Sequence, residues 1–269
     1  EEKKAAENSV NLDHVSYSSI RNWYKCPFRF KLSEIDNIEI FKPNAHLAFG
    51  KTMHSMCELL YKIEQIDQLN LKFDIVFLSE IKKLDSNYIK ENSSFIRELR
   101  SQGKNKINLI LPSFKKYFGN KYELISSEEL LMENIHNEPL ELKFKGFIDI
   151  VIKDNNDIYH IIDYKTCGWG WDAKKKSDKN ITYQLTLYKN YWSQKHNIPL
   201  NKVETHFALL KRTTKKDNIE IFRITSGDKK VKNALNYLHV PIVNIKREFY
   251  PKMKTSCSDC EYCFSKYCT

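Results

Sequence analysis

Two short segments decide the fold of this chain: Gly146-Phe147-Ile148-Asp149 and Asp163-Tyr164-Lys165. Each lies in a stretch where apolar and polar residues alternate, which is typical of a half-buried strand. The alternation places Asp149 on the face opposite its apolar neighbours, and it places Asp163 and Lys165 together on one face of the second strand. The sequence therefore predicts two strands that each present acidic or basic groups away from the core.

The connection between these strands is Asp154-Asn155-Asn156-Asp157, which is rich in residues that form hairpin turns. A loop with an odd number of residues, such as 155–157, would set Asp149 directly opposite Asp163. Two carboxylates and an amine on a rigid sheet can hold a divalent cation and position a water molecule, as a metal-dependent phosphodiesterase requires. Charged groups on a solvated sheet face are the plainer interpretation of the same pattern.

Other segments provide candidate partners for these groups. His54 follows Gly50 on an expected helix and becomes a metal ligand only if that helix reaches the face of Asp149. Glu128 or Glu129 could supply a third carboxylate, and either could equally be an exposed acid. Gln184 and Tyr188 lie four residues apart on an expected helix, and both can hydrogen-bond a phosphate or a bound water.

The remaining periodicity predicts one α/β domain with a helical insertion. Helical spacing is expected over 18–25, about 51–64, much of 71–118, 182–195 and about 228–248. Strands are expected over 121–135, 141–153, 157–166, 202–211 and 218–224. We expect a polar tail at 1–14, a catalytic domain at 15–250 with its helical insertion at about 65–120, and a cysteine-rich tail at 251–269.

Composition restricts the class of protein and its partners. The chain has 269 residues, 41% of them hydrophobic, and a net charge of +10, which favours a polyanionic partner such as nucleic acid. A lysine-rich proteome would give the same excess. No apolar run is long enough for a membrane span, and the charged first residues do not resemble a signal peptide, so a cytoplasmic location is expected.

The cysteines are concentrated at the end of the chain. Of seven, four are Cys257, Cys260, Cys263 and Cys268, and Cys26 lies near the other end. In a reducing compartment this clustering favours a metal over disulfides. Four thiolates can bind Zn²⁺ or an iron–sulfur cluster, and a zinc knuckle made from the tail alone would leave Cys26 free.

The motifs, in this order, resemble the RecB-like branch of the PD-(D/E)XK nuclease superfamily, and within it the iron–sulfur members, the Cas4-type exonucleases and the AddB-type nuclease domains. The resemblance extends over residues 16–268. The matching segments are Ser16 to Ile20 with Tyr24 to Phe28, Gly50 to His54, Gly146 to Asp149, Ile162 to Thr166, Gln184 to Tyr188, and the cysteine tail.

This resemblance implies a restriction-endonuclease-like mixed central sheet flanked by helices and a particular set of site residues. The implied catalytic residues are His54, Asp149, Asp163, Lys165, Gln184 and Tyr188. The Mg²⁺ or Mn²⁺ ligands would be His54, Asp149, Asp163 and the main-chain carbonyl of Tyr164. A 4Fe–4S cluster would bind Cys26, Cys257, Cys260 and Cys268, with Cys263 as the rival for the last position, and would join the two ends of the chain.

The implied activity is a divalent-metal-dependent DNA exonuclease that acts on single-stranded ends. Lysine-rich segments and Trp169 and Trp171 could contact DNA; these segments are Lys174-Lys175-Lys176, Lys211-Arg212, Lys215-Lys216 and Lys229-Lys230. The alternative is a non-catalytic DNA-end-binding or assembly subunit of a helicase–nuclease or CRISPR adaptation complex. The chain has no Walker-type nucleotide motif, so unwinding would require a helicase partner, and an integrase is a second partner to consider.

Overall fold

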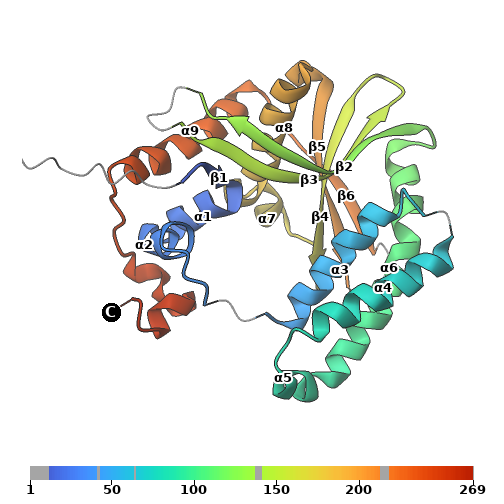
Figure 1. The fold of residues 1–269 in the computed structure, drawn as a ribbon. Helices are drawn as coiled ribbons and strands as arrows, with labels where there is room; N and C mark the ends of the chain where they lie inside the picture. Colours follow the sequence, from blue (N-terminus) through green and yellow to red (C-terminus); the bar gives the residue numbers. More distant parts are fainter. Residues whose placement is uncertain (1–11, 41–42, 64, 137–140, 213–217, 269) are drawn as a thin grey trace, which may run out of the picture. The chain divides into compact units, whose positions relative to one another are not determined.

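The computed structural model describes residues 12–40, 43–63, 65–136, 141–212 and 218–268 (Figure 1). Most of the polar tail expected at 1–14 lies outside the described residues, as do Lys215 and Lys216. The chain forms two compact units, each built from separate stretches of sequence. Unit 1 comprises 1–41, 131–146 and 228–269, and unit 2 comprises 42–130 and 147–227.

The strands form a six-stranded mixed sheet, which confirms the predicted fold class. They are β1 (His14–Ser16), β2 (Tyr122–Asn134), β3 (Lys143–Asp154), β4 (Tyr159–Cys167), β5 (Val203–Lys211) and β6 (Ile219–Ile224). The order is β1-β3-β4-β5-β6, with β2 also paired to β3. The short β1, which runs parallel to β3, was not foreseen from the sequence.

The β3–β4 hairpin has the register that the sequence predicted. Ile150 pairs with Ile162 and Lys153 with Tyr159, so continuing the register by one residue sets Asp149 opposite Asp163. The turn accounts for this register. Asp154 accepts hydrogen bonds from the N–H groups of Asn156 (2.8 Å) and Ile158 (3.0 Å), and Asp157 adopts φ 58°, as in a three-residue loop that ends in a left-handed residue.

In unit 2, a helical crossover joins β4 to β5, as their parallel pairing requires. The crossover contains the short α7 (Ala173–Ser177), which was not predicted, and α8 (Lys179–His196). The side chain of Asp178 caps α8 by accepting from the N–H of Asn180, and Trp192 of α8 packs on Tyr159 of β4 with ring centroids 5.2 Å apart. Helix α8 therefore covers the sheet face to which odd-numbered β4 residues point.

The other face of the unit 2 sheet is covered by α3 (Ala45–Leu59), α4 (Ile66–Ile81), α5 (Ser86–Glu91) and α6 (Ser93–Phe118) (Figure 1). Of these, α4 to α6 fall in the stretch of about 65–120 that we predicted to be a helical insertion, and α3 precedes it. Phe49, Phe73 and Phe114 are buried in one core with Ile162 and Tyr164 of the sheet. The insertion is thus part of the main hydrophobic core of this unit.

The start of α3 corrects one prediction. Gly50 was expected to precede the helix, but α3 begins at Ala45 and Gly50 lies inside it. The side chain of Asn44 caps the helix by accepting from the N–H of Leu47 at 3.1 Å. This capping group six residues upstream sets the helix start, and it outweighs the helix-breaking tendency of a single glycine.

Unit 1 brings the N-terminal helices against the C-terminal tail. Its helices are α1 (Tyr17–Lys25), α2 (Pro27–Phe30), a π-helical segment (Lys31–Ile35), α9 (Asp228–Lys246) and two 3₁₀ segments (Lys254–Asp259 and Glu261–Phe264). The hydroxyl of Ser256 donates to the carbonyl of Lys25 at 2.5 Å, and that of Tyr262 donates to the carbonyl of Ile38 at 2.6 Å. These bonds hold the two chain ends of unit 1 together.

Across the described residues, none of the helices combines the length and the apolar character that crossing a bilayer would require.

Candidate functional site

The two acidic residues and the lysine singled out in the sequence lie on the paired strands β3 and β4 of the sheet. Lys165 Nζ lies 2.8 Å from Asp163 Oδ2 on the same face of β4. Asp149 Oδ2 accepts a hydrogen bond from the main-chain N–H of Tyr164 at 2.6 Å, which ties β3 to β4 at this level. Both acidic residues are held by strands, so their positions depend on the sheet register.

Helix α3 brings His54 to this site although His54 is far away in the sequence. Its Nδ1 lies 3.2 Å from Asp149 Oδ1. Burial alone would lower the pKa of His54, but the hydrogen bond and charge of Asp149, together with the charge of Asp163, raise the pKa above its ordinary value. In the absence of another cation, this site therefore attracts a proton onto His54.

The third carboxylate is Glu128, whereas Glu129 has a different role. Ligand atoms of His54, Glu128 and Asp149 all lie within 4.8 Å of one another. Glu128 has φ 49°, an uncommon conformation for this residue type, of the kind that redirects a side chain in an irregular strand. Glu129 instead accepts a hydrogen bond from Trp192 Nε1 at 3.0 Å, next to Lys195 and His196.

The electrostatics of the site favour a bound cation. Burial raises the pKa of Asp163 to about 6, the charge of Lys165 opposes this, and the charge of Asp149 adds to it. Burial also raises the pKa of Glu128, and the charge of Asp149 contributes again. Grouped carboxylates that resist ionisation together are stabilised by a divalent metal, and carboxylate oxygens with an imidazole can hold a divalent ion. The donor set thus fits such an ion.

Gln184 and Tyr188 lie on the side of α8 that is close to the same carboxylates. Gln184 Nε2 donates to the Tyr188 hydroxyl at 3.1 Å. Burial raises the pKa of Tyr188, and the charges of Asp163 and Asp149 raise it further, so the phenol stays protonated. The pair is a hydrogen-bonding unit beside the acidic residues.

A cavity of about 730 Å³ adjoins the site within unit 2. His54 and Glu128 line it together with Gly50, Lys51 and Thr166. A Cβ atom on Gly50 would lie 3.4 Å from Thr166 Oγ1, so the missing side chain keeps this wall of the cavity open. The glycine inside α3 thereby gains a role that its sequence position did not reveal.

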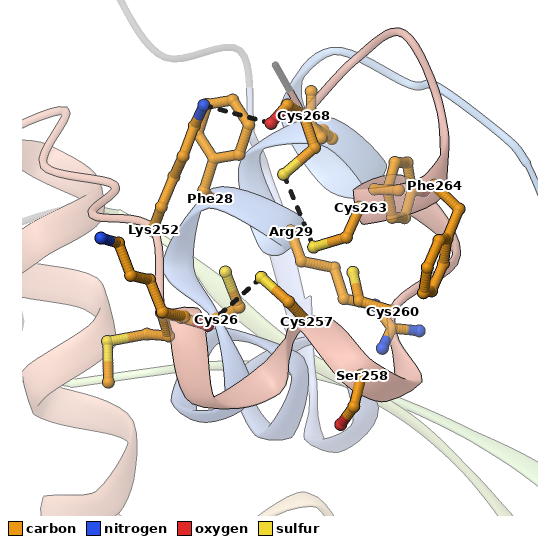
Figure 2. Close-up of a pocket in the computed structure, with 14 residues that line it drawn as sticks. Cys26, Phe28, Arg29, Lys252, Cys257, Ser258, Cys260, Cys263, Phe264 and Cys268 are labelled. Carbon is orange, nitrogen blue, oxygen red and sulfur yellow. Dashed lines mark hydrogen bonds between the residues drawn. The ribbon is translucent and has the colours of Figure 1, made fainter.

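A separate cavity in unit 1, of about 530 Å³, contains all five clustered cysteines (Figure 2). They are Cys26, Cys257, Cys260, Cys263 and Cys268. Cys263 Sγ lies 3.7 Å from Cys268 Sγ. The pKa of the Cys263 thiol is raised, chiefly by its hydrogen bond with the Cys257 thiol. Burial and the thiols of Cys268 and Cys260 raise it further. All five are free thiols, and their grouping around one cavity fits a sulfur-ligated metal group.

The aromatic and basic residues suggested for DNA binding divide into exposed and packed groups. The Trp169 side chain is 74% exposed, whereas Trp171 packs on Phe207 with ring centroids 5.1 Å apart. Lys176 and Lys211 both form ion pairs with Glu220. These two lysines therefore have a structural partner, and Trp169 remains as the accessible ring.

Paired strands that bring together two acidic residues and a lysine, with a helical histidine beside them, define the class of metal-dependent α/β nucleases. The sequence profile of the PD-(D/E)XK nuclease superfamily matches residues 14–268. The chain therefore belongs to the PD-(D/E)XK nuclease superfamily.

Two relatives and one solved structure are similar to this chain. The chain is 25% identical over 190 residues to the RecBCD enzyme subunit RecB of Borreliella burgdorferi. The aligned region covers 70% of this chain but only 13% of that subunit. The chain is 24% identical over 201 residues to an uncharacterized protein of Ureaplasma parvum, UU146, covering 74% of this chain and 86% of that protein. The fold is similar to a solved structure of a candidate exonuclease from Eubacterium rectale, with a TM-score of 0.58, 14% identity, and coverage of 98% and 92% of the two chains.

Proposed function

We propose that this protein is a divalent-metal-dependent DNA exonuclease that hydrolyses phosphodiester bonds at single-stranded ends. The observation that carries the proposal is the convergence of Asp149, Asp163 and Lys165, with His54 3.2 Å from Asp149 and Lys165 2.8 Å from Asp163. The family, whose nucleases use divalent metals, supports the same reaction.

The proposed metal ligands are His54, Asp149, Asp163 and the main-chain carbonyl of Tyr164. We propose Glu128 as a further ligand, because its carboxylate lies close to His54 and Asp149. In an extended strand the N–H and C=O of one residue project to the same side, so the carbonyl of Tyr164 is expected to face Asp149 as its N–H does. When bound, the ion supplies Lewis-acid activation of water and neutralises phosphate charge. His54 must lose its proton to bind, and occupancy is therefore expected to rise with pH.

The remaining side chains are assigned roles around the scissile phosphate. Lys165, held beside Asp163, would orient the attacking water and offset negative charge that develops on the phosphate oxygens. Gln184 and Tyr188 would donate hydrogen bonds to the DNA backbone, since the raised pKa of Tyr188 keeps its hydroxyl proton in place.

The preference for single strands rests on Trp169. This exposed indole lies two residues after β4 ends at Cys167, and unpaired bases stack readily on such a ring. Trp169→Ala should weaken binding of single-stranded DNA by about 1–3 kcal/mol, the usual value for one stacked base. Binding of blunt duplex DNA should change less.

The test uses the purified protein with linear and circular single-stranded DNA in Mg²⁺ or Mn²⁺. We expect the linear substrate to be degraded and the circular one to persist, because an exonuclease needs an end. Asp149→Asn and Lys165→Ala should each lower the rate by about 10²- to 10³-fold or more. Asp157→Asn is the matched control, since the same change is made in the hairpin turn.

Three results would overturn all or part of the proposal. Full activity in both Asp149→Asn and Lys165→Ala would reject the assigned residues. Binding of DNA ends with no cleavage in either metal would favour the non-catalytic end-binding subunit. Cleavage of the circular substrate would retain the nuclease and replace the exonuclease by an endonuclease.

We further propose that the unit 1 cavity holds a structural 4Fe–4S cluster on Cys26, Cys257, Cys260 and Cys268, with Cys263 as the rival for the fourth position. Five free thiols around one cavity support it. An anaerobic preparation should absorb near 400 nm, on the order expected for a thiolate-ligated cluster. Cys268→Ser should abolish this band and Cys263→Ser should retain it, and the reverse result would assign Cys263. A colourless protein with bound zinc would replace the cluster by a zinc site.

The partners of this nuclease are proposed from its relatives. Because one relative is a subunit of the RecBCD enzyme, we propose that this chain acts on ends supplied by a helicase in the cytoplasm. An integrase is the alternative partner. Co-purification of the full chain with either enzyme, tested in the presence of a DNA end, distinguishes the two.

A further inference from the structure

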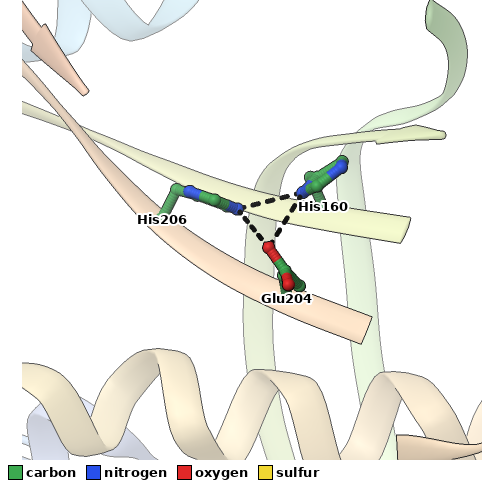
Figure 3. Close-up of side chains that lie close together, drawn as sticks. All are labelled: His160, Glu204 and His206. Atoms are coloured by element: carbon green, nitrogen blue, oxygen red, sulfur yellow. Dashed lines mark hydrogen bonds and ion pairs between the residues drawn. The ribbon is translucent and has the colours of Figure 1, made fainter. Parts of the chain in front are cut away.

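A second group of metal-ligating side chains lies in unit 2, outside the site described above (Figure 3). His160 of β4 pairs with Glu204 of β5, and Ile162 pairs with His206, so all three polar side chains share one sheet face. His160 Nδ1 lies 3.0 Å from His206 Nε2, and both nitrogens lie 3.8 Å from Glu204 Oε2. Three ligand atoms therefore converge on one point.

The opposite atoms of two of these groups are already engaged. His160 Nε2 lies 3.4 Å from Asp154 Oδ2, and Arg223 Nη2 lies 2.8 Å from Glu204 Oε1. A carboxylate behind a histidine fixes its tautomer and leaves the other ring nitrogen unprotonated, which is the usual arrangement behind a metal-bound imidazole. The arginine likewise orients the carboxylate with Oε2 toward the two rings.

The surroundings keep both imidazoles neutral. Burial lowers the pKa of His160, and burial together with the neighbouring His160 and Arg223 lowers the pKa of His206 to about 3. The rings of Tyr117 and Phe118 pack against His206 with centroids 5.6 and 5.1 Å away. Among the described residues, His206 Nδ1 has no hydrogen-bond partner, so the polar contact of this ring is made through Nε2.

We propose that His160 Nδ1, His206 Nε2 and Glu204 Oε2 bind a Zn²⁺ ion that is distinct from the catalytic metal. Zinc bonds of about 2.0–2.2 Å in a tetrahedron place neighbouring ligand atoms roughly 3.3–3.5 Å apart, and the three observed separations bracket this value. Two imidazoles select Zn²⁺ over Mg²⁺. A water molecule completes the four positions.

The role of this ion is structural. His160 precedes Asp163 by three residues and points to the opposite face of β4, about 10 Å along the strand from the catalytic carboxylates. The ion would join β4 to β5, and through Asp154 and Arg223 it would also fix the β3–β4 turn and β6. This zinc site does not depend on whether the chain cuts DNA.

The test measures zinc bound per chain after gel filtration in excess Mg²⁺, which occupies the catalytic carboxylates. We expect one equivalent of zinc that is lost in His206→Gln and in Glu204→Gln and retained in His239→Gln and in Asp149→Asn. Any zinc held by the cysteine cavity is common to all of these proteins and cancels in the comparison. The difference in zinc-edge X-ray absorption between wild type and Glu204→Gln should show nitrogen and oxygen ligands without sulfur, and zinc should raise the Tm more in wild type than in His206→Gln or Glu204→Gln.

The outcomes separate the zinc site from a simple histidine pair. Absence of zinc in wild type, or equal zinc in wild type, Glu204→Gln and His206→Gln, would overturn the proposal and leave a hydrogen-bonded pair of neutral imidazoles. Because His206 is buried, His206→Gln risks misfolding. Glu204→Gln keeps the shape of the side chain and an oxygen that can accept from Arg223. If His206→Gln does not fold, the loss of zinc in Glu204→Gln decides the test.

Discussion

The acidic site of unit 2 and the cysteine cavity of unit 1 achieve convergence of ligands by different means. Asp149 and Asp163 are on paired strands, and a main-chain hydrogen bond from Tyr164 orients Asp149. Cys257 and Cys263 lie on short 3₁₀ segments, Cys260 lies between these segments and Cys268 follows them. This tail is held by hydrogen bonds such as the one from Ser256 to Lys25. We therefore expect the sheet to preorganise the proposed oxygen ligands, whereas the proposed sulfur ligands would rely on a bound group to hold them in place.

The largest expected effect separates activity from stability at the acidic site. Asp163→Asn removes a buried charge whose pKa is raised to about 6, so metal-free protein should lose little stability or become slightly more stable. Nuclease activity should nevertheless fall by about 10²- to 10³-fold, because one ligand of the cation is weakened. Thermal unfolding in EDTA and a rate assay in Mn²⁺ measure the two effects.

This result would be contradicted by a large loss of stability in Asp163→Asn with unchanged activity. That combination would make Asp163 a structural partner of Lys165, which it contacts at 2.8 Å, and would end the view that the sheet holds the two acidic residues for a metal.

The cysteine cavity should behave in the opposite way. Cys260→Ser should abolish the absorption expected of the proposed iron–sulfur cluster and lower stability by about 2–5 kcal/mol, the range typical for loss of a covalent cross-link. Hydrogen exchange should accelerate over 251–268 and not over the β3–β4 hairpin. Cys57→Ser, which changes a buried cysteine of α3 outside the cavity, is the control. Equal exchange in both regions would show that the sulfur ligands are as preorganised as the acidic residues.

The two regions also differ in how far the sequence predicts them. The hairpin register followed from local features, alternation and a turn of odd length, and Asp149 and Asp163 could be paired on that basis. The approach of His54 depends on how α3 packs, and the choice of Glu128 over Glu129 depends on one positive φ value. Neither is encoded by a local pattern.

Other groups of residues come together only through long-range strand pairing, which local sequence patterns do not predict. His160 meets Glu204 and His206 only because the crossover of 35 residues, 168–202, returns β5 parallel to β4 in one particular register. For the cysteines, the spacing indicated a metal site and included Cys26, but it could not choose between Cys263 and Cys268, and both line the cavity.

A smaller effect is expected from the core beneath the acidic site. A Cβ atom on Gly103 of α6 would collide with the ring of Phe73, which is fully buried, and would lie 3.1 Å from Phe49. Gly103→Ala should therefore lower the free energy of unfolding by about 1–2 kcal/mol through overpacking. Gly227→Ala is the control, because nothing lies within 4 Å of the added atom. Denaturant unfolding measures both, and a stabilised Gly103→Ala would mean that α4 and α6 are loosely packed.

The smallest effect comes from the ion pairs that join α4 to α6. Asp74 lies 2.7 Å from Arg100 Nε and 2.6 Å from Lys104 Nζ. The hydrogen bond from Arg100 lowers the pKa of Asp74 to about 2. Burial opposes this shift, and the hydrogen bond from Lys104 adds to it. Since the folded-state pKa lies below the unfolded value, the stabilisation is complete above about pH 4 and is lost as the pH falls toward 2.

Asp74→Asn should therefore cost about 1 kcal/mol at neutral pH, a value limited by the solvent exposure of Arg100. The difference from wild type should shrink below pH 4 and vanish near pH 2. Urea unfolding at a series of pH values measures this difference, with Asp67→Asn on the exposed first turn of the same helix as the control. A difference independent of pH would show that Asp74 acts through helix packing and not through its charge. The packing of α4 against α6 would then be independent of the charge of Asp74. The cysteine cavity, by contrast, is expected to depend on a bound metal group for its order.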